Sequence, residues 1–153
     1  MSRPTQRLPT VLLARPESFA NQILGGVIRQ DGFNLVGRVS TLDGLLAEIN
    51  TRLPDVVVLD ASLARMAALC GRTMKLLRQV GHVVVYMECK QADFCLWLDA
   101  KFDAYLTDRD PLEELHHCLR AGGRGGVYYG TFFREMIQQL GVTGWLATPQ
   151  STA

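Results

Sequence analysis

A short apolar run that ends in a carboxylate constrains the fold of this chain more than any other feature. The run Val56–Leu59 is continuous and is followed directly by Asp60. Uninterrupted β-branched residues are typical of a strand that is buried on both faces, as in parallel sheets covered by helices. Open α/β sheets place their sites at the carboxyl ends of such strands. The run therefore predicts an α/β fold with Asp60 at the site-bearing edge of a sheet.

Apolar runs alternate with helical patterns along the rest of the chain. The expected strands cover 9–14, 33–39, 56–60, 82–87 and 104–106. Five helices are expected between and after them: one capped by Ser18, one capped by Thr41, and others over 65–79, over 92–100 and after an Asp110-Pro111 start. Five such strand-helix units with short connections imply a parallel sheet covered on both faces.

Composition limits the possible functions. The 153 residues and 48% hydrophobic content suit one domain with a proper core. A net charge of +1 gives no global field to recruit nucleic acid or an anionic membrane, so we expect neither as a direct partner. Four cysteines without a C-x-x-C pair are typical of reduced thiols, and no run is long enough to span a membrane. These features predict a cytoplasmic protein.

Four segments, taken in order, carry a resemblance to a known family: Leu12–Pro16, Pro54–Asp60, Asp103–Asp108 and Pro111–Leu115. Over residues 9–130 the chain resembles the receiver domains of bacterial response regulators in two-component systems. The closest likeness is to the NarL-like subfamily, which usually carries a LuxR-type helix-turn-helix. The resemblance implies a flavodoxin-like (CheY-like) three-layer sandwich with a five-stranded parallel sheet of order 2-1-3-4-5. Around this receiver-like domain we expect an N-terminal extension over 1–8, an extra C-terminal helix over 131–141 and a flexible tail over 142–153.

The resemblance also implies a site, which must be compared position by position. A working receiver has two acidic residues after its first strand that bind Mg²⁺, a phosphoacceptor Asp, a Ser or Thr ending the fourth strand, and a Lys after the fifth. Asp60 matches the phosphoacceptor, and Tyr105 keeps an aromatic that the family uses for switching. The other positions form a degenerate pocket, in which the expected polar groups are replaced by Ala14, Arg15, Met87 and Asp108.

These replacements remove the chemistry that phosphoryl transfer needs. The charge spread over the phosphoryl oxygens must be neutralised, normally by Mg²⁺ and its carboxylate ligands. Ala14 offers no ligand, and Arg15 would repel the cation and could pair with Asp60 instead. Met87 cannot hydrogen-bond to a phosphoryl oxygen. We therefore predict that the protein is not an enzyme, that its Mg²⁺ site is lost and that it uses no cofactor.

The sequence thus favours a phosphorylation-independent pseudo-receiver, which acts in signal transduction or transcription regulation through a protein partner or a homodimer. Two alternatives stay open: a genuine phosphoacceptor that uses Asp60, and a receiver fold that binds a small ligand. The expected interaction surface consists of apolar residues on helical segments: Trp97, Leu115, Leu119, Phe132 and Phe133.

Overall fold

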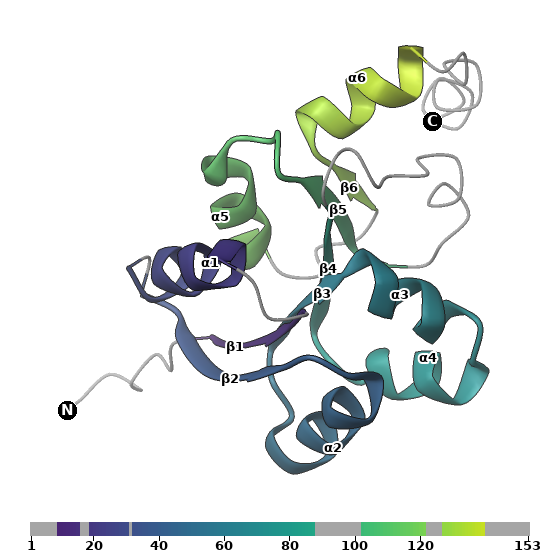
Figure 1. Cartoon of the computed structure of the whole chain (residues 1–153). Coiled ribbons are helices and arrows are strands. Elements are labelled where there is room, and N and C mark those ends of the chain that lie inside the picture. Colours follow the sequence, from purple (N-terminus) through teal and green to yellow (C-terminus); the bar gives the residue numbers. More distant parts are fainter. Residues whose placement is uncertain (1–8, 16–18, 31, 88–101, 122–126, 140–153) are drawn as a thin grey trace, which may run out of the picture. The chain divides into compact units, whose positions relative to one another are not determined.

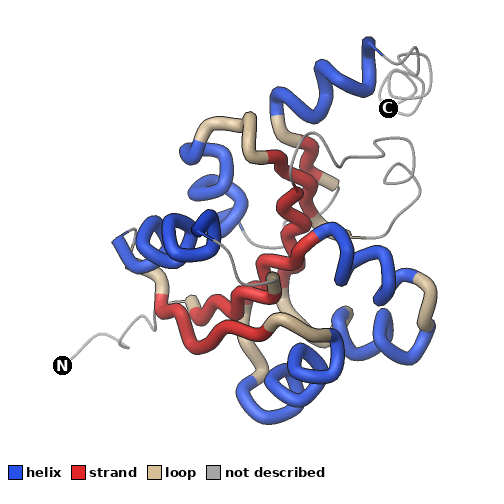
Figure 2. Tube along the Cα trace, viewed as in Figure 1, coloured by secondary structure: helices blue, strands red, loops and turns tan. Residues whose placement is uncertain are grey.

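The computed structural model describes residues 9–15, 19–30, 32–87, 102–121 and 127–139 (Figures 1 and 2). The chain divides into two compact units, residues 1–83 and 84–153, which are described in turn. Among the described residues, no helix is long and apolar enough to cross a lipid bilayer. The expected helix over 92–100 and its Trp97, as well as the expected cap Ser18, lie outside the described residues.

The first unit is built on three parallel strands. Its elements are β1 (Thr10–Ala14), α1 (Phe19–Gln30), β2 (Asn34–Val39), α2 (Leu42–Arg52), β3 (Val56–Asp60), α3 (Ala61–Ala68) and α4 (Gly71–Leu77). Strand β1 lies between β2 and β3 and is parallel to both. The apolar residues of β1 and β3 are almost entirely buried, as the continuous runs predicted.

The second unit contains most of β4 (His82–Met87), which begins at the end of the first unit, then β5 (Ala104–Thr107), α5 (Leu112–Ala121), β6 (Tyr128–Tyr129) and α6 (Thr131–Gln139). Strand β5 is parallel to β4 and to β6. Neighbouring strands follow the order β2-β1-β3 in the first unit and β4-β5-β6 from the end of the first unit onward, which confirms the parallel α/β fold. The structure also adds a sixth strand to the five expected. This short strand forms because the N–H of Tyr128 donates to Asp103 and that of Gly130 donates to Tyr105.

The predicted single helix over 65–79 is wrong, because the structure has two helices there. Helix α3 starts directly after β3, where Asp60 caps it, and ends at Ala68, with Leu69 as its C-cap. Cys70 is extended, with φ −125° and ψ 107°, and α4 begins at Gly71. Glycine is a poor helix former, which favours an interruption at this point. Figure 1 shows α3 and α4 side by side, and the two helices are in contact.

The N-terminal caps predicted for α2 and α5 have different outcomes. The predicted cap at Thr41 is confirmed, since its hydroxyl accepts from the N–H of Gly44 at 3.0 Å.

The predicted role of Asp110 as the N-cap of α5 is corrected. Helix α5 begins at Leu112, and the Asp110 carboxylate accepts from the N–H of Thr107 at 2.8 Å and from the N–H of Phe132 at 2.6 Å. Asp110 therefore joins the end of β5 to the start of α6.

Helix α6 packs within its own unit. Phe133 is fully buried, and its ring stacks on those of Tyr105 and Tyr129, at centroid distances of 5.8 and 5.5 Å. Leu115 and Leu119 of α5 are buried as well. The interaction-surface assignment is therefore corrected for Phe133, Leu115 and Leu119, because these side chains form the core of the second unit.

Candidate functional site

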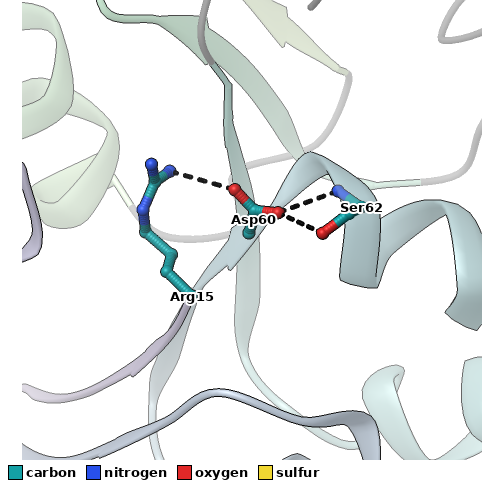
Figure 3. Close-up of polar contacts among 3 residues, drawn as sticks. All are labelled: Arg15, Asp60 and Ser62. Atoms are coloured by element: carbon teal, nitrogen blue, oxygen red, sulfur yellow. Dashed lines mark hydrogen bonds and ion pairs between the residues drawn. The ribbon is translucent and has the colours of Figure 1, made fainter. Parts of the chain in front are cut away.

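The site candidate with a defined geometry lies at the carboxyl end of β3. Strands β1 and β3 are paired with Ala14 opposite Leu59, so that Arg15 and Asp60, the next residues, lie at the same edge of the sheet. Both side chains are largely buried, with 5% and 13% exposed surface. One guanidinium nitrogen of Arg15, Nη1, lies 3.8 Å from Oδ1 of Asp60. Figure 3 marks this ion pair with a dashed line. The predicted pairing of these two residues is thus present.

The second carboxylate oxygen of Asp60 caps helix α3. Its Oδ2 accepts a hydrogen bond from the N–H of Ser62 at 3.0 Å and another from the Ser62 hydroxyl (Figure 3). This is an N-cap arrangement, in which a side-chain oxygen satisfies a backbone donor of the first helical turn. The sequence reasoning had missed the role of Ser62. The Asp-x-Ser spacing at a strand-helix junction was the signal that could have identified it.

Among the described residues around Asp60, Ala14 and Arg15 supply no oxygen ligand for a Mg²⁺ ion. Mg²⁺ requires oxygen ligands, usually from carboxylates. Ala14 is buried and has no polar side-chain atom, while Arg15 brings a cation to the position where a metal ligand is expected. Within the described residues, no three His, Cys, Asp or Glu side chains are grouped so that they could hold a metal.

Two other residues, Met87 and Asp108, were assigned to the pocket from the resemblance alone. Both belong to the second unit. Met87 is fully buried at the end of β4, in register with Thr107 of β5. The N–H of Asp108 donates to the carbonyl oxygen of Met87 at 3.0 Å, and the Asp108 side chain is exposed. The Thr107 hydroxyl, which the sequence reasoning did not single out, donates to Asp110 at 3.1 Å. An apolar side chain and an internally bonded hydroxyl thus end β4 and β5.

Tyr105 lies in the aromatic core of the second unit. Its ring stacks on Tyr129 at 5.4 Å, and its hydroxyl accepts from the N–H of Phe102 at 3.1 Å. Burial of the side chain raises the pKa of the Tyr105 hydroxyl above its usual value of 10.0. These contacts hold the ring inside, which matches a packing role for this residue.

Comparison with solved structures gives a consistent answer, although no family model and no curated protein sequence match the chain. A two-component response regulator of the LuxR family from Aurantimonas has a TM-score of 0.70 at 15% identity, covering 89% of this chain and 99% of its own. An RcsB structure, solved as two dimers bound to two parallel DNAs, has a TM-score of 0.68 at 12% identity, covering 86% and 69%.

A third structure with the same architecture contains a metal ion. It is the receiver domain of a sensor histidine kinase from Pseudomonas aeruginosa, with a magnesium ion coordinated in its active site cleft. Its TM-score is 0.57 at 13% identity, covering 75% of this chain and 97% of its own. At these identities the likeness establishes architecture and nothing finer. The chain has the fold of response-regulator receiver domains.

Proposed function

We propose that this chain is a pseudo-receiver, a signalling module that works without phosphorylation of Asp60 and acts by binding a protein partner or a second copy. The proposal rests on one observation: both oxygens of the Asp60 carboxylate are already used. One faces the Arg15 guanidinium at 3.8 Å, and the other accepts two hydrogen bonds from Ser62. The Arg15 cation and the Ser62 donors stabilise the negative charge of the carboxylate, which makes it a weaker nucleophile.

The electrostatics around Asp60 supports the same proposal. Phosphoryl transfer is catalysed mainly by positioning and by neutralising charge on the transferred group. Arg15 supplies a single cation, and it is already directed at the carboxylate. Ala14 supplies no carboxylate for a metal. The solved receiver that holds magnesium in its cleft offers a direct positive control for experiments on this point.

We expect no saturable Mg²⁺ binding in isothermal titration calorimetry at millimolar concentrations. The reason is that a Mg²⁺ ion at Asp60 would have to displace the Arg15 guanidinium or lie beside it, and neither Ala14 nor Arg15 offers a carboxylate in compensation. The Asp60→Asn variant should give the same heats as the unmodified protein. Binding that is present in the unmodified protein and lost in Asp60→Asn would contradict this expectation.

We also expect acetyl phosphate to leave Asp60 unmodified. Intact-protein mass spectrometry after incubation with acetyl phosphate, with and without Mg²⁺, should show no added phosphoryl group, whereas a functional receiver treated in parallel should show one. Asp60→Asn serves as the matched control, because it keeps the shape of the side chain and removes the acceptor. A labile adduct that is absent from Asp60→Asn would overturn the proposal.

One observation would favour the alternative, a true phosphoacceptor. The Arg15 guanidinium lies where it could replace part of the charge of a metal, and guanidinium groups bind phosphoryl oxygens well. If an adduct formed without Mg²⁺ and failed to form in Arg15→Leu, this second function would be the correct one. The expectation that the chain does not bind nucleic acid directly stays a prediction, and the RcsB neighbour is itself solved on DNA.

A further inference from the structure

The two short helices after Asp60 form a basic surface that the net charge of the chain conceals. Residues 61–81 contain no Asp or Glu and four cations. All four cationic side chains are exposed: Arg65, Arg72, Lys75 and Arg78. We call these cations, together with the exposed Met66 and Leu69, the α3–α4 face.

The small net charge arises from two opposed halves. Residues 1–83 contain ten Lys and Arg against six Asp and Glu, and residues 84–153 contain six against nine. The first unit is therefore positive, and the second is negative. The net charge of the whole chain therefore does not reveal an electrostatic docking site, since a local field depends on where charges lie and not on their sum.

Three carboxylates of the first unit have partners other than the cations of this face. Glu48 pairs with Arg52 at 2.7 Å, Asp55 accepts from Thr10 at 2.8 Å, and Asp60 is held by Arg15 and Ser62. None of the four cations of the α3–α4 face forms an ion pair with a residue that the structure describes. Their charge is therefore available to an external anion.

The cations and the apolar residues are arranged together. Arg72, Lys75 and Arg78 recur at every third residue along α4 and its end, so they follow one side of the helix at steps of about 4.5 Å along its axis. Leu69 and Met66 lie at the end of α3, with 85% and 52% of their surface exposed. The contact between α3 and α4 places the apolar turn and the basic stripe on neighbouring helices.

We propose that the α3–α4 face docks an acidic amphipathic helix of a partner protein. In this arrangement, Asp or Glu side chains of the partner face the stripe formed by Arg72, Lys75 and Arg78, and an apolar residue covers Leu69. The proposal rests on the proposed function, which requires a protein contact, and it names the chemistry of that contact. Recognition of an amphipathic helix combines apolar anchors at helical spacing with complementary charges beside them.

Two other anionic partners fit the face less well. Single-stranded nucleic acids are bound by stacking of bases on aromatic side chains, and the face contains none. Helices that lie in a membrane surface bury a long apolar stripe, whereas this face exposes two large apolar residues at one turn. An acidic amphipathic helix requires only cations beside an apolar contact, and the face supplies both.

The test uses the full chain and a fluorescein-labelled peptide of about four helical turns, with leucines at i, i+3, i+4 and i+7 and glutamates elsewhere. Fluorescence anisotropy should show saturable binding that weakens as the ionic strength rises from about 0.05 to about 0.5 M. The double variant R72E/K75E should weaken binding about tenfold or more, because two attractive charges become repulsive. Leu69→Ser should weaken it about threefold or more by removing the apolar anchor.

Matched variants separate this face from the general surface. R29E/R120E reverses two exposed cations elsewhere, on α1 and α5, with the same change in net charge and should leave the affinity within about twofold. Leu112→Ser removes an exposed leucine of α5 and should also be neutral. Circular dichroism must show that each variant remains folded.

The proposal is overturned if the peptide does not bind, if R29E/R120E weakens binding as much as R72E/K75E, or if duplex DNA or phosphatidylserine vesicles bind more tightly than the peptide. Failure of the proposed function is distinguishable, because it is read from a different signal. An acetyl phosphate adduct on Asp60 would overturn phosphorylation independence and leave the peptide result standing. Absent peptide binding would remove this face as the docking site and leave the Asp60 chemistry as proposed.

Discussion

Phe133→Ala should destabilise the protein by about 3–5 kcal/mol, as expected when a fully buried phenylalanine is truncated. Phe133 anchors α6 by stacking on Tyr105 and Tyr129, and none of its surface is exposed. Urea unfolding followed by far-ultraviolet circular dichroism measures the change. Phe133→Leu should recover a large part of the loss, because it restores most of the buried apolar volume.

Phe132→Ala is the matched control for this substitution. Phe132 is half-buried and lies 6.0 Å from the Arg109 guanidinium, so its removal should cost about 1 kcal/mol. The loss in Phe133→Ala should also be the same at all protein concentrations, since Phe133 packs within its own chain. Equal effects of the two truncations, or a loss that depends on protein concentration, would place Phe133 at an intermolecular contact.

Asp110→Ala should destabilise the protein by roughly 2–4 kcal/mol, because it leaves two backbone N–H groups without an acceptor. The buried carboxylate of Asp110 binds the N–H and the hydroxyl of Thr107 and the N–H of Phe132. A Cβ atom on Gly130 would lie 2.5 Å from Oδ2 of Asp110, so the carboxylate also requires a glycine before α6. Thermal unfolding of Asp110→Ala, beside the exposed Asp108→Ala as the control, measures the effect. A loss no larger than that in Asp108→Ala would contradict it.

The pH dependence of this contact has a defined sign. Burial raises the pKa of the Asp110 carboxyl in the folded protein above its usual value of 3.8. The folded state therefore binds the proton more tightly than the unfolded state does. The stabilisation from protonated Asp110 is fully present below pH 3.8 and is lost as the pH rises through the folded-state pKa. Asp110→Asn does not titrate, so the stability difference from the unmodified protein should change over this window.

Strands β3 and β4 and the pairing of Arg15 with Asp60 could be predicted because they depend on short stretches of sequence. The boundaries of β3 and β4 agree with the predicted ranges 56–60 and 82–87, because continuous β-branched runs favour buried strands and little else. The predicted pairing of Arg15 with Asp60 is confirmed as well. Once both residues follow adjacent parallel strands, the geometry of the sheet brings them to the same edge.

The boundaries of the helix after β3 were predicted wrongly. They depend on the apolar helical pattern and on local capping and backbone conformation, which differ little in free energy. A helical apolar pattern continues through 65–79, but capping by Asp60 starts α3 earlier, and the extended Cys70 followed by Gly71 separates α4. Through this break, the exposed Met66 and Leu69 lie at the end of α3 and the basic stripe lies on α4, two separate helices that are in contact. A single continuous helix would have distributed the same side chains differently around its axis.

What the sequence by itself determined is the parallel α/β order and the approach of Arg15 to Asp60 at one edge of the sheet. Tertiary structure decided the rest of the second unit. The local sequence predicts that Asp110 caps α5. In the structure its carboxylate accepts a hydrogen bond from the N–H of Phe132, 22 residues further along the chain. Strand β6 is only two residues long and exists through its bonds to β5. Such contacts join segments that are distant in sequence, and they form only when packing brings the donors and acceptors together.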